Sequence, residues 1–496
     1  MNWTLEEVKK HNTRECPPRL APAPLPRSRY TLLCPLSFDP SHHRQDHPGG
    51  AAIILKYAGR DATAAYEPIH PADALEKNLP ASAHLGPVNT DAASTLEAAV
   101  RNRRKTKDEI RIEEAHKYKP ALSHVLSLRD MEDVAKKVLP HKAYAYYSSS
   151  TEDTISKNEN AHAFSRFFFH ARVMRPVSRC DPSTTILGFK SSIPVFVSGA
   201  AMAKLAHPDG ELNITRGCAA QGIIQMVSSN ASYSYAEIAH AATPTQPLFF
   251  QLYKHKDDAL ALQRIREVEA LGYKALFLTV DAVVPSKREF DIRAPWYLEE
   301  LERGGPMEFV EEQADALQGQ SFGTAGGLIV NDDRDMTWER TIPWLRSVTR
   351  LPIVLKGIQC VEDALLAAEA GVDGILISNH GGRQLDYSLP PIEVLYRLRK
   401  HHPEVFGKME IYIDGGITRG SDVLKAVCLG ATAVGLGRPY LYAQGAYGVA
   451  GVKRITHILE TEIVTAMRLM GASRIKDLTP ELVERVDWQV GLKARL

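Results

Sequence analysis

Eight short apolar runs recur between residues 194 and 436, and a stretch with helical periodicity follows each of them. Continuous apolar runs of this length are typical of parallel strands that are buried on both faces. Repeated strand–helix units of this number favour a (β/α)8 TIM barrel of the α/β class. The expected strands are residues 194–198, 223–227, 248–252, 275–280, 353–356, 374–378, 410–414 and 433–436.

A doubly wound open sheet is the alternative arrangement for alternating strands and helices. The count of eight units favours the barrel, and no G-x-G-x-x-G fingerprint follows an early strand. The spacing between the fourth and fifth runs is long, and residues 289–331 are rich in Gly, Glu and Gln. We therefore expect an insertion between these two strands.

The chain of 496 residues exceeds the length of one barrel, and its composition divides it. Seven prolines fall between Pro17 and Pro40, and short helix-like stretches follow His47. A basic run at residues 101–105 opens a charged segment, which indicates a solvated linker. We expect a small domain over residues 1–80, a charged linker over 81–120, the barrel over 121–480 and a C-terminal tail over 481–496.

Composition excludes several functional classes. The 60 basic and 59 acidic residues leave a formal charge of +1, which argues against a nucleic-acid-binding face. No run of 18 apolar residues occurs, so we expect no membrane span. Six cysteines without a C-x-x-C pair indicate a reducing compartment rather than a disulfide scaffold. The first residues resemble neither a signal peptide nor a transit peptide.

Polar or glycine-rich residues follow all eight expected strands, where the functional groups of a barrel lie. The first four strands end at Ser198-Gly199-Ala200-Ala201, Ser228, Gln251 with Tyr253, and Thr279 with Asp281. The last four end at Lys356, Ser378 with His380 and Arg383, Asp414-Gly415-Gly416, and Gly437-Arg438. Polar residues with purely structural roles would be scattered, so this gathering predicts one functional site.

The loops after the seventh and eighth expected strands are suited to bind an anion. Glycines at positions 415, 416 and 437 let backbone N–H groups approach a ligand without interference from a Cβ atom. Barrels commonly hold a phosphate between the loops after strands seven and eight. Arg438 adds positive charge, so we expect a phosphate there.

His380 and Arg383 predict chemistry on a small acid. An arginine grips a carboxylate through two parallel hydrogen bonds, and a histidine takes a proton near neutral pH. Asp281 is placed to orient the imidazole and stabilise its cation, and Lys356 to face a developing negative charge. The combination predicts a carboxylate clamp beside a general base.

The most specific motif is SNHGGRQLD at residues 378–386. The segments QLY at 251–253, TVD at 279–281, LKG at 355–357 and GRP at 437–439 accompany it in order. From about residue 122 to 480 the chain resembles the FMN-dependent α-hydroxy acid oxidoreductases. The resemblance implies oxidation of an L-2-hydroxy acid to a 2-keto acid, and it leaves carbanion and hydride routes open.

The resemblance also implies roles for single residues. His380 is the implied base with Asp281 as its partner, and Lys356 lies by the flavin N1 edge. The implied substrate contacts are Arg383, Tyr146, Tyr253 and Arg288. The implied contacts to the flavin ring are Ser198, Gly199, Ala200, Ala201, Ser228, Gln251, Thr279 and Ser378. The implied contacts to ribityl and phosphate are Asp414, Gly415, Gly416, Arg419, Gly437 and Arg438.

Three positions depart from the family pattern. Thr418 replaces the first of two arginines after Asp-Gly-Gly and leaves only Arg419, so a phosphate contact is either lost or re-made by the threonine hydroxyl. Asn230 stands where family members carry Trp or Leu, which leaves the preferred substrate chain length open. Ser150 replaces a glycine in the turn after Tyr146.

The N-terminal segment resembles the cytochrome b5 fold through residues 3–12, HPGG at 47–50, AGRDAT at 58–63 and PIH at 68–70. The resemblance implies haem b held by His47 and His70, an electron carrier because no coordination position stays open. Prolines occupy the stretch between His11 and His47 where the family has strands. The alternative is that the two histidines are residual.

The two resemblances together imply an L-lactate dehydrogenase of the cytochrome type, with electrons passed through haem to cytochrome c. One alternative is a peroxisomal glycolate-type oxidase that uses oxygen and has a vestigial haem domain. A non-catalytic flavin- or haem-binding protein is the other. The family implies a homotetramer. The C-terminal Ala-Arg-Leu resembles a peroxisomal address, and cytoplasm or the mitochondrial intermembrane space remain as other compartments.

Overall fold

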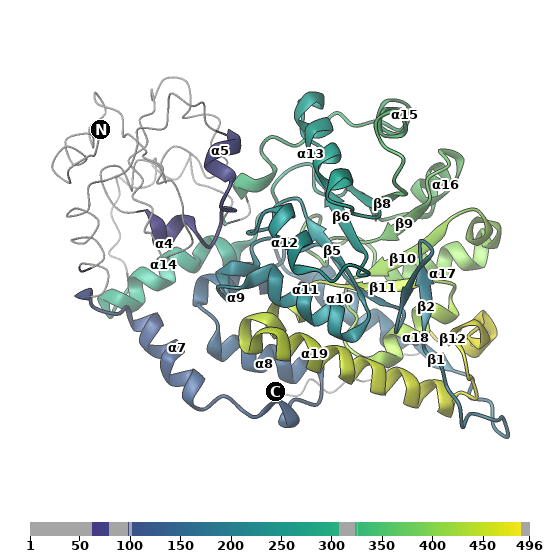
Figure 1. The fold of residues 1–496 in the computed structure, drawn as a ribbon. Helices are drawn as coiled ribbons and strands as arrows, with labels where there is room; N and C mark the ends of the chain where they lie inside the picture. The colour runs from purple at the N-terminus through teal and green to yellow at the C-terminus, as the bar shows by residue number, and fades with distance from the viewer. Residues whose placement is uncertain (1–61, 79–97, 99–101, 307–322, 325, 488–496) are drawn as a thin grey trace.

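The structure is a computed structural model that describes residues 62–78, 98, 102–306, 323–324 and 326–487 (Figure 1). Several expectations lie outside these residues. They concern the proline-rich segment, the haem ligand His47 and the C-terminal tripeptide at 494–496.

Eight parallel strands form a closed barrel in the order β10-β11-β4-β5-β6-β7-β8-β9 (Figure 1). This confirms the predicted (β/α)8 barrel. Three strands coincide with the expected ranges at both ends, and the others differ by one or two residues. The strands are β4 (Val195–Val197), β5 (Ile224–Ser228), β6 (Leu248–Leu252), β7 (Leu276–Thr279), β8 (Ile353–Ile358), β9 (Gly374–Ile377), β10 (Glu410–Asp414) and β11 (Ala433–Leu436).

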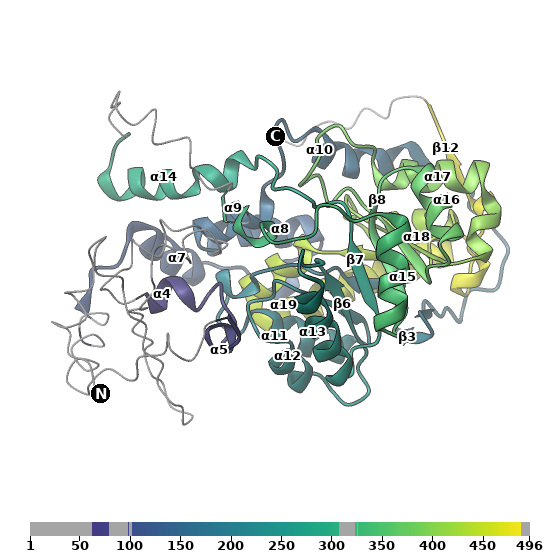
Figure 2. The same cartoon turned by 90° about the horizontal axis from the view of Figure 1, so that it is seen from above.

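Helices surround the barrel on its outer face, as Figures 1 and 2 show from two directions. Their apolar sides pack on the strands, so each strand is buried on both faces, as its continuous apolar sequence requires. The helices are α11 (Gly210–Gln221), α12 (Tyr235–Ala241), α13 (Asp258–Ala270), α15 (Trp338–Val348), α16 (Val361–Glu369), α17 (Pro391–His401), α18 (Gly420–Cys428) and α19 (Arg438–Leu469).

Aromatic side chains fill the inside of the barrel and close it at one end. Phe249 and Phe277 stack there with ring centroids 5.6 Å apart. The hairpin of β2 (Thr184–Ile186) and β3 (Phe189–Ser191) adds Ile186 to this cluster. Because Leu187 N–H donates to the Glu410 carboxylate at the start of β10, the hairpin covers the amino ends of the strands. The carboxyl ends of the barrel strands are therefore the ends at which a functional site can form.

A bulge interrupts the pairing of β8 with β9 between Lys356 and Ile358. Gly357 has φ +110° there, and a Cβ atom at this position would lie 2.5 Å from Asp281 Cγ. Only glycine allows this approach without strain. The bulge therefore brings the end of β8 against Asp281.

The expected linker contains an ordered helix, α7 (Lys107–Lys117). Thr106 and Glu109 form a capping box at its start, and Arg111 donates to the Leu139 carbonyl at 2.7 Å after α8 (Leu128–Val138). The charges in this segment indicated solvation, but part of them cap the helix or bind it to α8. Helices α9 (His141–Ser148) and α10 (Ile155–His162) follow.

Residues 483–485, expected in a C-terminal tail, form strand β12 (Val483–Arg485). This strand pairs antiparallel with β1 (Phe167–Phe169), and Arg485 Nε donates to Glu393 Oε2 at 2.9 Å. Two three-residue strands carry too little periodicity to be seen in a sequence. The ordered body therefore extends beyond residue 480.

The long interval between β7 and β8 contains α14 (Glu289–Arg303) and the short η7 turn (Gly326–Ile329), where we expected an insertion. Figure 2 shows α14 reaching away from the barrel beside α7 and α9. The Tyr297 ring stacks on His141 of α9 at 4.0 Å between centroids. The insertion thus packs on the helices that precede the barrel.

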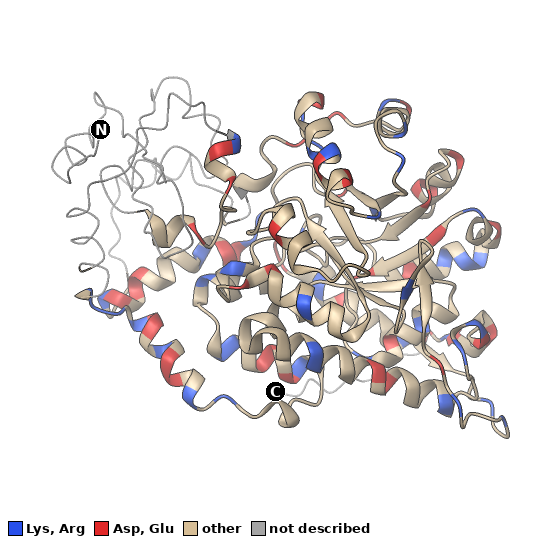
Figure 3. Ribbon diagram, in the orientation of Figure 1, with Lys and Arg blue, Asp and Glu red and all other residues tan. Residues whose placement is uncertain are grey.

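Two short helices belong to the described part of the N-terminal segment, α4 (Thr63–Tyr66) and α5 (Ala74–Asn78). Lys77 of α5 lies 2.6 Å from Glu267 of α13 and so joins this segment to the barrel. None of the helices in the described ranges is long and apolar enough to cross a membrane. Figure 3 shows basic and acidic residues interspersed along the helices, in keeping with the balanced charge.

Candidate active site

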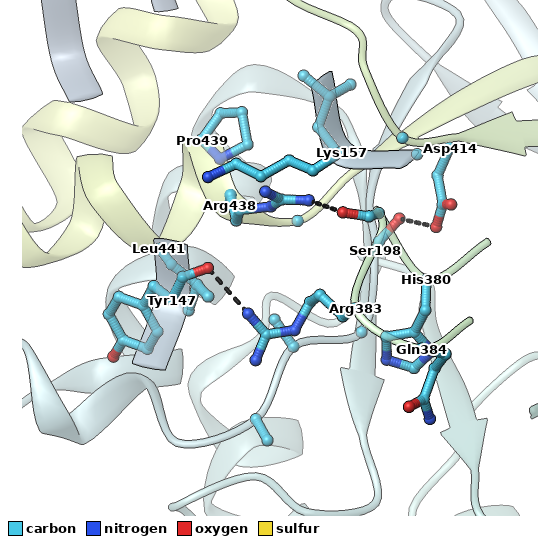
Figure 4. A pocket seen from close by; sticks show the side chains of 18 of the residues that line it. Tyr147, Lys157, Ser198, His380, Arg383, Gln384, Asp414, Arg438, Pro439 and Leu441 are labelled. Carbon is cyan, nitrogen blue, oxygen red and sulfur yellow. Dashed lines mark hydrogen bonds between the residues drawn. The ribbon is translucent and has the colours of Figure 1, made fainter. Parts of the chain in front are cut away.

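A cavity of about 420 Å³ opens at the carboxyl ends of the barrel strands (Figure 4). Its volume lies in the range of small-molecule and cofactor sites. Most of the residues that the sequence predicted for the site line it. They are Tyr146, Ser198, Gly199, Ala200, Ala201, Ser228, Tyr253, Arg288, Lys356, His380, Arg383, Asp414, Gly415, Gly416, Gly437 and Arg438.

Four other predicted residues lie directly behind the cavity wall. Ser228 Oγ donates to Gln251 Oε1 at 2.9 Å, and Gln251 Nε2 donates to Thr279 Oγ1 at 2.8 Å. This row crosses β5, β6 and β7 and fixes the polar atoms beneath the cavity. Ser378 Oγ accepts the backbone N–H of His380 at 3.0 Å, and the fourth residue is Asp281.

Three charged groups meet where β7, β8 and β9 end. His380 Nδ1 lies 2.9 Å from Asp281 Oδ1, and Lys356 Nζ lies 3.8 Å from Asp281 Oδ2. The carboxylate is completely buried. Because it accepts from Nδ1, the neutral imidazole has its lone pair on Nε2, and this atom lies 3.4 Å from the Tyr253 hydroxyl.

The three groups also control one another's charge. Burial lowers the pKa of His380, and Lys356 lowers it further against the opposing effect of Asp281. Burial raises the pKa of Asp281, but Lys356 and His380 outweigh this and hold the pKa below its usual value. At neutral pH the aspartate is ionised and the histidine is neutral, the state that a general base requires.

The loop that carries His380 has an unusual backbone. His380 has φ +58°, and Gly381 and Gly382 follow with +66° and +74°. A histidine in the left-handed region is strained, and such strain concentrates at functional sites. A Cβ atom at position 381 would lie 2.5 Å from Arg438 Nη2, so the glycine admits this arginine.

Two arginines converge near His380. Arg383 Nη1 donates to the carbonyls of Tyr146 at 2.8 Å and Tyr147 at 3.0 Å, and its guanidinium lies 5.1 Å from the Tyr146 ring centre. Arg288 Nε donates to the Arg383 carbonyl at 3.2 Å. The pKa of Arg288 is lowered to about 10, mainly by burial and in addition by the charge of Arg383. A buried and a half-buried like charge so close together favour an anion between them.

The loops after β10 and β11 approach closely at the same cavity. Gly415 and Gly416 have φ +87° and +82°, and a Cβ atom at Gly416 would overlap the Asn160 carbonyl. Ser198 Oγ donates to Asp414 Oδ2 at 3.2 Å, and the Arg438 guanidinium donates to the Gly381 carbonyl (Figure 4). The arrangement matches the predicted anion-binding loops.

Arg419 does not line the cavity beside the loops after β10 and β11, in contrast to the prediction. Its Nη1 lies 2.8 Å from Glu462 of α19, and its side chain is 53% exposed. The neighbouring Thr418 lines the cavity, but its hydroxyl donates to Asp422 Oδ2 at 3.1 Å. Arg419 begins α18, and the packing of α19 on that helix supplies its carboxylate partner. The Thr418 hydroxyl proton is therefore not available to a ligand.

Helix α10 contributes residues that sequence reasoning missed. Lys157 lines the cavity, and the side-chain amides of Asn160 and Asn379 exchange two hydrogen bonds of 2.7 Å each. Because α10 precedes the barrel strands, the rule that functional residues follow strands gave no signal for it. Asn230 also lines the cavity, and its Nδ2 has no hydrogen-bond partner among the described residues.

Unpartnered buried atoms test whether FMN fits the cavity. In the described part of the chain, neither Lys356 Nζ nor Asp414 Oδ1 has a hydrogen-bond partner. A buried donor and a buried acceptor are costly when left unpaired. A flavin ring offers acceptors, a ribityl chain offers hydroxyls, and a phosphate suits the glycine loops with Arg438. The residues fit this cofactor.

Of the two predicted haem ligands, the structure describes His70. Its Nδ1 lies 3.2 Å from the Tyr66 carbonyl, and its ring stacks on Tyr66 with centroids 4.2 Å apart. A hydrogen bond from Nδ1 to a carbonyl is the contact that orients metal-binding histidines.

Two protein families match the chain. The FMN-dependent dehydrogenase family matches residues 135–485, and the cytochrome b5-like heme/steroid binding domain matches residues 4–89. The chain therefore belongs to the FMN-dependent dehydrogenase family, and it is an enzyme. It combines the flavin-binding barrel with a cytochrome b5-like domain at its N-terminal end.

The chain is also similar to individual proteins and to a solved structure. It is 40% identical to an L-lactate dehydrogenase (cytochrome) of Wickerhamomyces anomalus over 97% of this chain and 79% of that protein. It is 38% identical to glycolate oxidase 3 of Arabidopsis thaliana over 73% of this chain and 97% of the relative. A mutant flavocytochrome b2 with pyruvate bound superimposes with a TM-score of 0.68 at 38% identity, covering 77% and 92% of the two chains.

The position of Arg419 leads to a test of the phosphate loops. We expect Arg419→Gln to retain FMN like the wild type, because the arginine pairs with Glu462 away from the cavity. Arg438→Gln removes a cation from the cavity wall, so we expect it to lose FMN during gel filtration. The flavin-to-protein absorbance ratio measures both. Loss of flavin from Arg419→Gln would contradict this placement.

Proposed function

We propose that this enzyme oxidises L-lactate to pyruvate with FMN and passes the electrons through haem to cytochrome c. The observation that carries the proposal is the His380–Asp281 pair beside two arginines that favour a carboxylate. Relatives named L-lactate dehydrogenase (cytochrome) and a similar structure that holds pyruvate support this choice of substrate.

The chain's own residues bind and orient the substrate. The Nη1 atom of Arg383 is held by backbone carbonyls, so Nε and Nη2 can grip the substrate carboxylate with help from Arg288 and Tyr146. The substrate hydroxyl would then lie within hydrogen-bond reach of both the Tyr253 hydroxyl and His380 Nε2, which are 3.4 Å apart. The substrate carbon that loses hydrogen is thereby held beside the base.

Proton transfer falls to His380. Its Nε2 accepts one proton from the bound substrate, and Asp281 stabilises the imidazolium that forms. FMN, when bound, would take up the two electrons and the second proton that the hydroxy acid loses as it becomes a keto acid. Lys356 would offset the negative charge that then develops at the flavin edge. The row of Ser228, Gln251 and Thr279 and the loops around Asp414 would hold the cofactor.

We propose that His47 and His70 would hold the iron of haem b. The match of residues 4–89 to a cytochrome b5-like domain supports this pair, as does the Nδ1 hydrogen bond of His70. Haem with two histidine ligands carries electrons without binding substrate. Cytochrome c as the acceptor and a homotetrameric assembly are proposals that rest on the family resemblance.

A glycolate-type oxidase that uses oxygen is the second candidate. Glycolate oxidases at about 38% identity favour it, but they match only 73% of this chain. The two cytochrome-type relatives match 97% and 96% of it, and these matches therefore include the N-terminal segment. This difference in coverage favours electron transfer to haem over direct transfer to oxygen.

An absorption spectrum of the purified full chain tests the function. Under nitrogen, we expect L-lactate to bleach the flavin band and then convert the haem bands to their reduced form. Added cytochrome c should then become reduced. A flavin that stays oxidised would contradict the proposed substrate. Haem that stays oxidised, together with peroxide formation in air, would support the oxidase.

A substitution at His380 tests the proposed base. His380→Gln keeps a polar side chain but cannot accept the proton, so we expect flavin reduction by L-lactate to slow by about 100- to 10,000-fold. Stopped-flow absorbance measures the rate, and the flavin spectrum verifies that FMN is still bound. His401→Gln, an exposed histidine of α17, is the matched control. Reduction at the wild-type rate in His380→Gln would rule out this role.

The haem ligands are tested separately from the flavin. We expect His70→Ala to lose the haem bands and to keep the flavin band, because the barrel binds FMN independently of this residue. Flavin reduction by L-lactate should persist while cytochrome c reduction stops. His240→Ala on α12 serves as a control that retains both chromophores. Unchanged haem bands in His70→Ala would show that another residue is the ligand.

A further inference from the structure

The phosphate end of the cavity lacks a charge that the family pattern supplies. Thr418 stands in place of an arginine, and its hydroxyl donates to Asp422 at 3.1 Å. Arg419 pairs with Glu462 outside the cavity. Among the described residues of the loops after β10 and β11, Arg438 is therefore the one that brings positive charge to this part of the cavity wall.

Lys157 of α10 supplies a second cation at the same place. Figure 4 shows its side chain running alongside Arg438 toward Pro439, and all three residues line the cavity. Its Nζ donates to the Ser148 carbonyl at 2.7 Å, which occupies one of its three N–H groups. The other two remain for a ligand.

The loop after β9 is shaped to let α10 approach. Gly382 has φ +74°, and a Cβ atom at this position would lie 2.5 Å from the Lys157 backbone nitrogen. The preceding Gly381 makes room for the Arg438 guanidinium in the same way. Two consecutive glycines thus place the two cations next to each other.

The electrostatics of Lys157 point to a missing anion. The pKa of Lys157 is lowered to about 8, mainly by burial and in addition by the positive charge of Arg438, although Glu132 opposes this. Arg438 is half-buried like Lys157, and desolvation lowers its pKa as well. Two neighbouring cations that are partly removed from water repel each other, and an anion between them relieves this repulsion.

We propose that Lys157 is the second cation of the flavin phosphate site and binds the 5′-phosphate of FMN beside Arg438. It replaces, from a different helix, the positive charge that position 418 lacks. This inference rests on the proposed FMN-dependent function. The alternative role for Lys157 is structural, since its bond to Ser148 ties α10 to the end of α9.

Riboflavin separates the two roles because it has the same ring and ribityl chain as FMN but no phosphate. Dissociation constants for FMN and riboflavin are measured by flavin fluorescence on the full chain of the wild type, Lys157→Gln and Lys157→Arg. We expect Lys157→Gln to bind FMN about 10- to 100-fold more weakly, the effect of one charge-assisted hydrogen bond, and riboflavin as the wild type does. Lys157→Arg keeps the charge and should bind FMN within a few-fold of the wild type.

Lys136→Gln, which removes an exposed lysine from α8, should leave both constants unchanged. Equal FMN affinity in Lys157→Gln and wild type would overturn the inference, and so would an equal loss of FMN and riboflavin affinity, which marks a structural role. If the proposed function itself were wrong, these experiments would give a different result. In that case the wild type itself would not bind FMN, or L-lactate would not reduce it.

Discussion

The buried carboxylate of Asp281 is the interaction on which the active site depends. It lies 2.9 Å from His380 Nδ1 and 3.8 Å from Lys356 Nζ, and solvent does not reach it. An isolated charge at such a place is strongly unfavourable, so the three groups must be present together. They come from the ends of three adjacent strands, and the bulge at Gly357 is what lets them meet. The chemistry of the site therefore depends on the closed barrel.

The same cavity gathers more positive charge than this carboxylate can balance. Arg383 and Arg288 converge near His380, and Arg438 and Lys157 run side by side close to the glycine loops. Buried and half-buried cations in such numbers favour anionic ligands, because each ligand charge relieves the repulsion between them. A carboxylate substrate and a phosphate-bearing flavin have the charges that this cavity requires.

Much of this arrangement could be predicted from local sequence. The eight apolar runs located the barrel strands to within two residues, because burial on both faces leaves a continuous apolar signal. The rule that functional groups follow the strands then found His380, Lys356 and Arg438. Features without such a signal were missed. Helix α7 resembled a linker because it is charged, and the three-residue strand β12 is too short to show periodicity.

The sequence alone determined the kind of barrel and the identity of its reactive groups. Both follow from residue type and spacing along one continuous stretch of chain. Tertiary structure decided which cations face the cavity. Arg419 follows a barrel strand, yet it turns to Glu462 on α19, and Lys157 precedes every barrel strand, yet it lines the site. The physical reason is that the direction of a long side chain depends on the partners that distant helices bring to it. No local pattern of residues encodes those partners.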